Sequence, residues 1–223
     1  MKKVALGNTC LKVSRIGMGV MPIGPNQLSL PLEEGAAIVK YALEKGIDFL
    51  DTAQYYHTYS YIREAMKGSS FEPIISSKSL APDYSGMMKA IEEARTGLDM
   101  DIIDIFLLHE IRSEDFEKRL GAWEALNDAK AKGLIKAIGI STHNIDVTDE
   151  ISTQKECDVV FPLINYAGLG IRKGSEAGDA QEMLSAIEKC KTAGKGIYAM
   201  KVFGGGNLTV NYQKALDFIC SKK

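Results

Sequence analysis

Four side chains of this sequence together have the chemistry of a proton-transfer site. The carboxylate of Asp51 follows an apolar run, and Tyr56 lies five residues further along the chain. Lys78 and His109 stand at the ends of the next two apolar runs. A phenol with its usual pKa of about 10 exchanges its proton poorly near neutral pH, but a nearby ammonium stabilises the phenolate and lowers that pKa. A carboxylate would hold the ammonium in place, and an imidazole would orient a carbonyl or share its proton.

The elements that must position these side chains are short apolar runs that alternate with amphipathic segments. The amphipathic segments have apolar residues at helical spacing, and Phe116, Leu120 and Trp123, for example, are expected on one face of a helix. The starts of the apolar runs recur roughly every 25 to 35 residues, which is the size of a βα unit. We predict strands at seven runs: Arg15–Gly19, Ile47–Asp51, Ile74–Lys78, Ile102–His109, Lys136–Ser141, Val159–Asn165 and Ile197–Val202.

Two α/β architectures fit this order of elements, an open doubly wound sheet and a (β/α) barrel. The glycines at 17, 19 and 24 lack the G-x-G-x-x-G spacing of a dinucleotide-binding turn, which argues against the open sheet. A barrel brings the carboxyl ends of all its strands to one mouth. We therefore predict an α/β fold of the (β/α)8 TIM-barrel type, formed by residues 1–223 as a single domain. Polar residues end six of the runs, as that mouth requires: Asp51, Lys78, His109, Ser141–Asn144, Asn165 and Lys201.

The composition excludes several other classes of protein. The 223 residues are 45% hydrophobic and 25% charged, which suits one globular domain and rules out disorder. The formal net charge is −2, with scattered Lys and Arg, so we expect no nucleic-acid or membrane surface. No apolar run approaches the roughly 20 residues of a membrane-spanning helix, and the N-terminus does not resemble a signal peptide. The four cysteines lie far apart in the sequence, so we predict no metal site, and reduced thiols in a cytoplasmic protein.

Several segments resemble the aldo-keto reductase family. The motifs are G-I-D-F-L-D-T-A at 46–53 followed by Tyr56, S-K at 77–78, L-L-H at 107–109 and I-G-I-S at 138–141. The opening L-G-N-T-C-L-K-V-S-R-I-G-M-G at 6–19 is similar to the family's N-terminal β-hairpin and first strand. The segment M-K-V-F-G-G-G at 200–206 resembles the end of its seventh strand. The resemblance runs from about residue 3 to about residue 221, and the four catalytic positions in the right order make it specific.

This resemblance implies a (β/α)8 barrel with an N-terminal β-hairpin and with NADP(H) bound across its mouth, NAD(H) being the alternative cofactor. The reaction would be the transfer of hydride between this cofactor and a small carbonyl or alcohol substrate. Carried over by position, Tyr56 is the general acid for reduction. Lys78 and Asp51 tune this acid, and His109 orients the carbonyl.

The resemblance also implies where the cofactor would lie. Ser141 and Asn165 would bond the nicotinamide carboxamide, with Thr142 or His143 beside them. Met200 stands where many members stack an aromatic ring on the nicotinamide, and a thioether can still pack on a ring face. The glycines at 204–206 would either form a flexible loop or let the backbone approach the pyrophosphate. The cofactor-binding residues predicted in this way are Gly19, Val20, Ser141, Thr142, Asn165, Met200, Lys201, Val202, Phe203 and Gly204.

The sequence departs from the family at its end, because we count about seven βα units and expect the eighth to be absent. Seven parallel strands would expose an edge on the first and the last strand, so we expect self-association or a completing partner chain there. Two other functions stay open. One is a catalytically impaired cofactor-binding or interaction module derived from the same family. The other is a Schiff-base aldolase that uses Lys78 or Lys201 as a nucleophilic amine.

Overall fold

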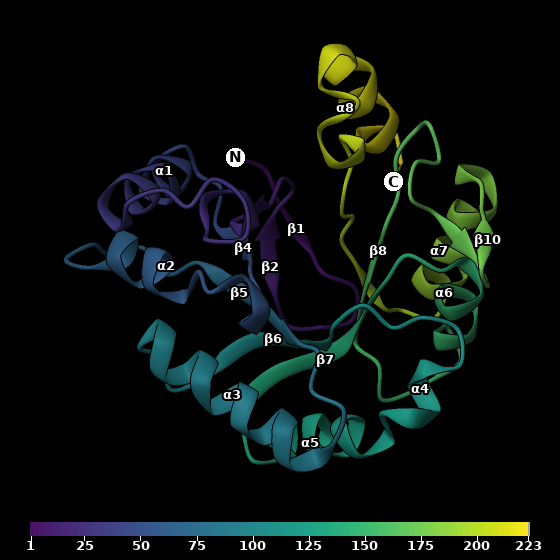
Figure 1. Ribbon diagram of the computed structural model, residues 1–223, viewed down its shortest axis with the longest axis horizontal. Coiled ribbons are helices and arrows are strands. Elements are labelled where there is room, and N and C mark those ends of the chain that lie inside the picture. The colour runs from purple at the N-terminus through teal and green to yellow at the C-terminus, as the bar shows by residue number, and fades with distance from the viewer. Residues whose placement is uncertain (223) are drawn as a thin grey trace.

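The fold is built on one parallel sheet, which the computed structural model describes together with the rest of residues 1–222. Its spatial order is β11-β8-β7-β6-β5-β4-β3, so the seven strands follow one another in chain order, and the sheet curls as a barrel wall does (Figure 1). The expected α/β fold of barrel type with seven parallel strands is therefore confirmed. The strands are β3 (Met18–Gly19), β4 (Phe49–Asp51), β5 (Ile74–Ser79), β6 (Ile103–Leu108), β7 (Ile135–Thr142), β8 (Val159–Pro162) and β11 (Gly196–Ile197).

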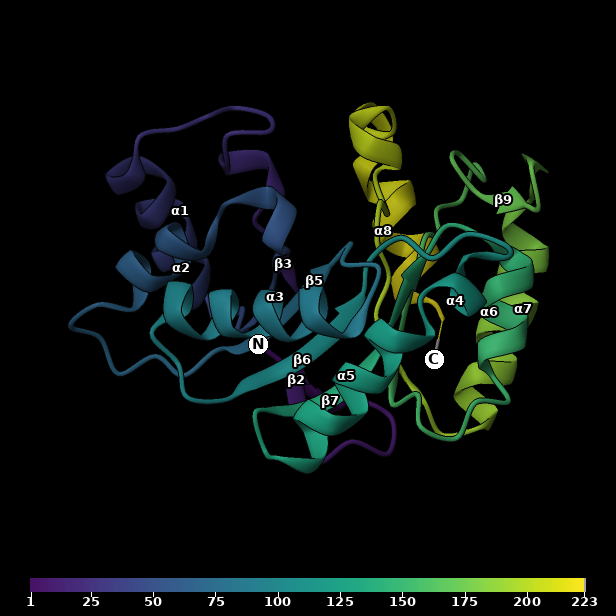
Figure 2. The ribbon, with the colours of Figure 1, turned by 60° about the horizontal axis from the view of Figure 1, so that its bottom comes forward.

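Helices cover the outer, convex face of this sheet (Figures 1 and 2). They are α1 (Leu32–Glu44), α2 (Tyr59–Met66), α3 (Tyr84–Leu98), α4 (Asp115–Lys118), α5 (Leu120–Ala131), α6 (Ile145–Ile151) and α7 (Ala180–Thr192). The last helix, α8 (Tyr212–Cys220), rises away from this layer, and Ala215 is its one fully buried residue. Short 3-10 turns form at η1 (Met21–Ile23), η2 (Gln54–Tyr56), η3 (Gly204–Gly206) and η4 (Thr209–Asn211). Among residues 1–222, no helix combines the length and the apolar character that crossing a membrane requires.

Strand β6 shows why these apolar runs form a parallel sheet buried on both faces. Every one of its residues is buried. Phe106 and Leu108 pack in the cluster that includes the residues of the outer helices. Ile105 and Leu107, which alternate with them, pack in the cluster of the barrel interior. A strand between two apolar layers needs mainly apolar residues, which is why it appears in the sequence as a nearly continuous apolar run. The one exception is Asp104, whose buried carboxylate accepts from Lys136 Nζ and from the backbone nitrogen of Ile75.

An antiparallel hairpin of β1 (Lys3–Ala5) and β2 (Lys12–Ser14) closes the end of the barrel at which the strands begin. Leu6 and Val13 of this hairpin pack with Phe49 in the barrel interior. At Gly7, whose φ is +55°, a Cβ atom would lie 2.2 Å from the backbone nitrogen that begins β11, so only glycine allows this close approach. Because the hairpin fills this end, the opposite end, where the strands finish, stays available for the polar residues.

The prediction that Phe116, Leu120 and Trp123 share one face of a single helix was wrong. The chain forms two helices, α4 and α5, which meet at Arg119, and Leu120 is 54% exposed rather than buried beside Phe116 and Trp123. Arg119 has a φ of −116°, outside the helical range, and its side chain bonds to backbone carbonyls of the neighbouring strand ends. The segment at 167–178, between β8 and α7, contains a small hairpin of β9 (Arg172–Lys173) and β10 (Glu176–Ala177).

Candidate active site

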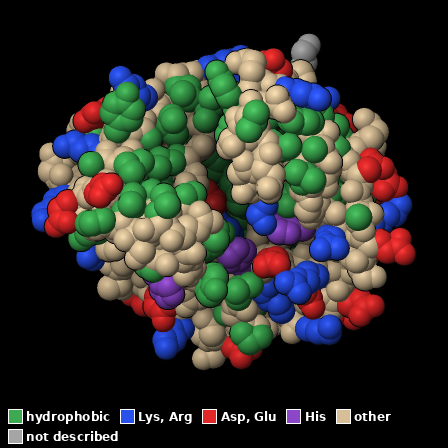
Figure 3. All heavy atoms as spheres, turned by 45° about the horizontal axis from the view of Figure 1, so that its top comes forward, with side chains coloured by type: hydrophobic (Ala, Val, Ile, Leu, Met, Phe, Trp, Pro, Cys, Tyr) green, Lys and Arg blue, Asp and Glu red, His purple; other side chains and the backbone are tan. Residues whose placement is uncertain are grey.

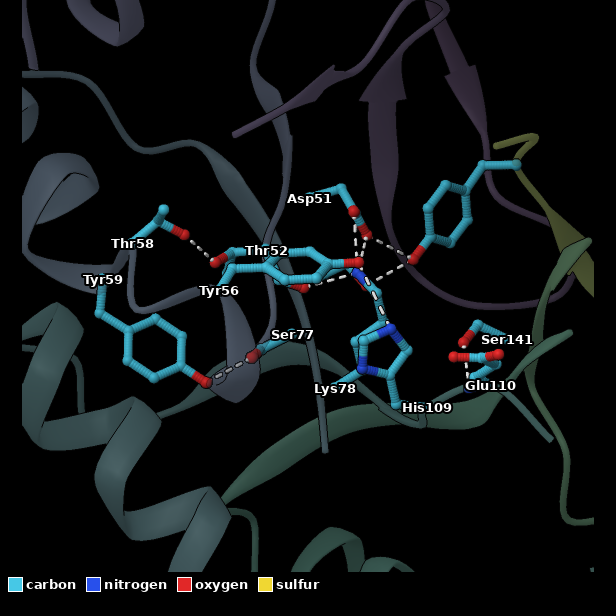
Figure 4. A network of polar contacts seen from close by, with 12 residues as sticks. Asp51, Thr52, Tyr56, Thr58, Tyr59, Ser77, Lys78, His109, Glu110 and Ser141 are labelled. Carbon is cyan, nitrogen blue, oxygen red and sulfur yellow. Dashed lines mark hydrogen bonds and ion pairs between the residues drawn. The ribbon is translucent and has the colours of Figure 1, made fainter. Parts of the chain in front are cut away.

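A buried ion pair lies at the centre of the mouth. Lys78, near the end of β5, is 1% exposed, and its Nζ lies 2.9 Å and 2.8 Å from the two carboxylate oxygens of Asp51 at the end of β4. The third donor position of Nζ is used by the carbonyl of Thr52, at 2.6 Å (Figure 4). Burial raises the pKa of the Asp51 carboxyl and lowers that of the Lys78 ammonium, while their mutual attraction opposes both shifts.

Tyr56 and His109 meet beside this pair. The Tyr56 hydroxyl, carried by η2 just after β4, lies 3.3 Å from His109 Nε2 at the end of β6. The two rings meet edge to face with centroids 5.5 Å apart, and Lys78 Nζ lies 4.8 Å from the centroid of the phenol ring. The structure thus brings together all four side chains that the sequence predicts as catalytic, from three neighbouring strand ends (Figure 4).

The neighbouring tyrosines do not share this position. Tyr59 bonds to Ser77 Oγ at 2.7 Å, and Tyr61 donates to the carbonyl of Leu30 at 2.7 Å. Tyr55 is 56% exposed. Geometry therefore singles out Tyr56 among the tyrosines of this segment.

The expectation of a lowered pKa for Tyr56 was wrong, because the pKa of this phenol is raised overall. Burial raises the pKa of this phenol, and the negative charges of Asp51 and Glu110 raise it further. Lys78 Nζ lies 4.8 Å from the centroid of the phenol ring, but its charge is compensated by a carboxylate at hydrogen-bond distance. The phenol is therefore protonated at neutral pH.

The imidazole of His109 is neutral at the same pH. Burial, followed by the positive charges of Lys78 and Arg119, lowers its pKa to about 3, and His143 and Lys201 act in the same direction. Its Nδ1 is buried and has no hydrogen-bond partner among the described residues, whereas Nε2 faces Tyr56.

Sequence reasoning missed Tyr198, which supports the ion pair from the far side of the barrel. Its hydroxyl donates to Asp51 Oδ1 at 3.2 Å and lies 2.7 Å from Ser76 Oγ. Its ring stacks on Phe161, with centroids 3.9 Å apart and an interplanar angle of 16°. Tyr198 belongs to an apolar run that the sequence assigns to the core, so no pattern in the sequence marks its hydroxyl as part of the site.

We expect Tyr198→Phe to destabilise the protein by about 1–3 kcal/mol, because Asp51 and the buried Ser76 hydroxyl lose a partner. Its turnover should also fall, since the hydrogen bond that holds the Asp51 carboxylate toward Lys78 is gone. Tyr61→Phe is the matched control, because that buried phenol bonds outside the mouth. Denaturant unfolding and steady-state kinetics of both variants check this. Equal turnover in the two variants would contradict a role of Tyr198 in the site.

Ser141 and Thr142, at the end of β7, differ in what they offer a ligand. Ser141 Oγ accepts a hydrogen bond from the backbone nitrogen of Glu110 at 2.9 Å, and its own proton has no acceptor among residues 1–222. Thr142 Oγ1 donates to the carbonyl of Ile111 at 2.6 Å and accepts from the backbone of Asn144. The Ser141 hydroxyl is therefore available as a donor, whereas the Thr142 hydroxyl holds the loop after β6.

The Asn165 amide is used by its own loop and, at 3.4 Å from Nδ2, by the carbonyl of Lys201 in the segment after β11. Its Nδ2 donates to the carbonyl of Leu169 at 2.9 Å, and its Oδ1 accepts from the backbone nitrogens of Ala167 and Leu169. The side chain is 0% exposed. In this arrangement Asn165 shapes the turn after β8 and presents neither end of its amide to the mouth.

The segment after β11 brings a cation and flexible backbone to the mouth. Lys201 has a φ of +55°, unusual for a residue with a Cβ, and its Nζ lies 3.1 Å from His143 Nε2. Glycines 204–206 all have positive φ, and a Cβ at Gly205 or Gly206 would meet no atom within 4 Å.

The end of β3 also borders open space. A Cβ at Gly19 would meet no atom within 4 Å, and Val20 beside it is buried. Figure 3 shows histidines on the wall of a hollow in this face, with basic and acidic side chains beside them.

Comparisons with known proteins point to one family. The sequence model of the aldo/keto reductase family matches residues 15–222. L-galactose dehydrogenase of Arabidopsis thaliana is 26% identical over 220 residues, which cover 92% of this chain and 66% of that protein. Morphine 6-dehydrogenase of Pseudomonas putida is 25% identical over 167 residues, which cover 73% and 53%. The chain thus spans between about half and two thirds of the length of these relatives.

Solved structures share the fold at low identity. A Pseudomonas aeruginosa protein assigned to the aldo-keto reductases matches with a TM-score of 0.80 and 21% identity, over 99% of this chain and 85% of that chain. The Bombyx mori aldo-keto reductase, solved in complex with NADP, matches with a TM-score of 0.70 and 18% identity, over 91% and 67%. The sequence-model match over most of the chain carries the assignment, and the shared fold agrees with it. This chain therefore belongs to the aldo/keto reductase family.

Proposed function

We propose that this protein is an NAD(P)H-dependent oxidoreductase that transfers hydride between the nicotinamide and a small carbonyl or alcohol substrate. The observation that carries this proposal is the contact of the Tyr56 hydroxyl with His109, directly beside the buried Lys78 ammonium. The relatives' names agree with such chemistry, because they include dehydrogenases and a methylglyoxal reductase of Escherichia coli.

Tyr56 is the proton donor in the direction of reduction. The nicotinamide, when bound, supplies hydride to the carbonyl carbon, and the oxygen gains negative charge at the same time. A phenol with a raised pKa can still protonate this oxygen, because an alkoxide is a much stronger base than a phenolate. In the direction of oxidation Tyr56 must accept a proton as phenolate, and the nearby Lys78 ammonium stabilises that charge.

The unpartnered Nδ1 of His109 indicates which tautomer is present. A proton on Nδ1 would leave a buried N–H without an acceptor, which is costly, whereas a proton on Nε2 points toward Tyr56 and the mouth. With the Nε2 proton, His109 donates to the phenol oxygen. The Tyr56 proton is then free for the carbonyl oxygen, and a neutral Nε2–H can orient that oxygen as well.

The residues of the mouth fit a nicotinamide cofactor, with one change from the sequence-based expectation. The free donor of Ser141 suits the carboxamide, the backbone of Gly19 and Val20 borders the same mouth, and Lys201 suits the phosphates. Met200 and the stretch at 202–204 lie beside Lys201 and remain proposed contacts, as does Thr142 through its backbone. Asn165 would contribute by holding its own loop and the Lys201 carbonyl, because both ends of its amide are already bonded.

Titration with NADPH and with NADH, followed by nicotinamide fluorescence, tests the cofactor. We expect saturable binding, and Ser141→Ala should weaken it by about 3- to 10-fold, the value of one neutral hydrogen bond. Ser152→Ala is the control, because Ser152 bonds to Asp149 near the start of β8. Folded protein that binds neither cofactor would contradict the proposal.

Addition of small aldehydes and ketones to the NADPH complex tests the activity. Oxidation of NADPH with loss of carbonyl is expected, and binding without turnover of any carbonyl would favour the impaired cofactor-binding module.

The Schiff-base alternative is disfavoured for Lys78, because all three of its donor positions are used and its amine is held as an ammonium. Borohydride inactivation that requires a carbonyl substrate would reveal such a nucleophile.

A further inference from the structure

Arg119, between α4 and α5, is a buried cation that bonds to backbone only. It is 9% exposed, and it donates to the carbonyls of His109 at 2.8 Å, Ser79 at 2.8 Å and Ala81 at 3.2 Å. Within residues 1–222, no carboxylate lies within the 4.0 Å of an ion pair, and Asp115 acts on it only at longer range. Burying an arginine without a carboxylate is costly, so the three carbonyls must compensate for that cost.

These carbonyls lie where the sheet no longer holds the strand ends. The pairing of β5 with β6 finishes at Ser79 and Leu108. Beyond it, His109 donates to the Ser79 carbonyl at 2.9 Å, and Glu110 turns into a left-handed conformation with φ of +53°. The Ser79 carbonyl therefore accepts from both His109 and Arg119. The planar fork of a guanidinium can bridge several acceptors at fixed angles, which an ammonium cannot.

The same contacts reach the segments that carry the other reacting groups. Ser79 directly follows Lys78, so fixing its carbonyl fixes the end of the strand that carries the lysine. The Ser79 hydroxyl donates to Gln54 Oε1 at 2.7 Å, and Gln54 begins the short turn that carries Tyr56. Arg119 is thus connected to all three elements that place Tyr56, Lys78 and His109.

We propose that Arg119 is a positioning residue, which holds the ends of β5 and β6 in the arrangement that proton transfer between Tyr56 and the substrate requires. This inference rests on the proposed oxidoreductase function. The geometry also gives its charge a role, since Arg119 disfavours a second positive charge on His109. The charged or titratable groups around His109 are Tyr56, Lys78, Glu110, Arg119, His143 and Lys201.

Three variants separate positioning from mere stabilisation. Arg119→Met removes the fork and the charge, and Arg119→Lys keeps the charge without the fork. The matched control is Lys195→Met, because Lys195 is 5% exposed and also donates only to backbone carbonyls, those of Gln154 and Cys157, at the opposite end of the barrel. We measure unfolding, kcat and KM for reduction, and the pKa of His109 by NMR in the protein without cofactor.

Arg119→Met should lower kcat by about 10²-fold with a smaller change in KM, because misplacement by about 1 Å can cost that much. It should also raise the pKa of His109, although burial and the Lys78 ammonium, the two larger causes of the low value, stay in place. Arg119→Lys should keep the low pKa of His109 and still lose about tenfold in kcat. Lys195→Met should lose stability without changing either property of the folded protein.

Two results would overturn the inference. One is an Arg119→Met protein whose His109 pKa and kcat match those of Lys195→Met. If Arg119→Met does not fold, Arg119→Lys decides, and a wild-type kcat in that variant would show that the fork is not needed. The NMR titration needs no turnover, so a His109 pKa that is unmoved in a folded Arg119→Met protein counts against this inference even if the proposed activity fails.

Discussion

Tyr56→Phe is expected to lower turnover by about 10²- to 10⁴-fold, the usual contribution of a general acid. The phenol oxygen is the atom that meets His109 Nε2, and under the proposed function its proton goes to a substrate held there. The affinity for NADPH should hardly change, because removing the hydroxyl leaves the aromatic ring in place. Single-turnover reduction of a carbonyl by the NADPH complex measures the chemical step directly.

Tyr55→Phe is the control for this experiment. Tyr55 is adjacent in sequence but 56% exposed, so its variant should keep wild-type turnover. Retention of full activity by Tyr56→Phe, or an equal loss in the two variants, would show that the proton comes from another group. A loss of NADPH binding in Tyr56→Phe would instead indicate a disturbed mouth.

The second large effect is expected for Lys78→Met, on stability as well as on activity. The change leaves the Asp51 carboxylate buried beside Tyr198 without its cation. Breaking a buried pair on one side costs about 3–5 kcal/mol, and we expect a loss of unfolding free energy of that size at pH 7. Turnover should fall strongly too, because no ammonium remains to stabilise a phenolate on Tyr56.

The stability of Lys78→Met should depend on pH with a definite sign. Burial already raises the pKa of Asp51 above its ordinary value of 3.8, and loss of the ammonium removes the main opposing influence. Between 3.8 and the raised pKa, the folded state binds more protons than the unfolded state, so unfolding free energy decreases as pH rises. Moving from pH 7 to pH 5 should therefore restore part of the lost stability, relative to the wild-type protein.

The double variant Lys78→Met with Asp51→Asn separates this charge effect from lost packing. It removes both charges, so it should be more stable than Lys78→Met alone and should lose the recovery at lower pH. Denaturant unfolding of the four proteins of this cycle at pH 7 and pH 5 gives the coupling. A Lys78→Met protein as stable as the wild type would contradict a buried, charged pair.

The seven parallel strands, and the order of the polar residues at their ends, could be predicted from the sequence alone. Apolar runs at the spacing of a βα unit predict a parallel sheet, because strands buried on both faces are mainly apolar. The residue that ends each run then lies at one mouth, so Asp51, Lys78 and His109 come together as a consequence of topology. That is why the proximity of the proposed catalytic residues was predictable without any coordinates.

The surroundings of those groups depend on contacts between residues far apart in the sequence. Tyr198, directly after β11 and 147 positions from Asp51, joins the site from the far side of the barrel, and a hydroxyl within an apolar run carries no signal of its partner. Arg119 likewise ends an expected helical face to hold strand ends that precede it by 10 to 40 positions. The raised pKa of Tyr56 and the committed amide of Asn165 depend on burial and on distances of a few ångströms. Sequence spacing specifies which side chains share a mouth, but hydrogen bonds and desolvation depend on atomic positions that long-range packing sets.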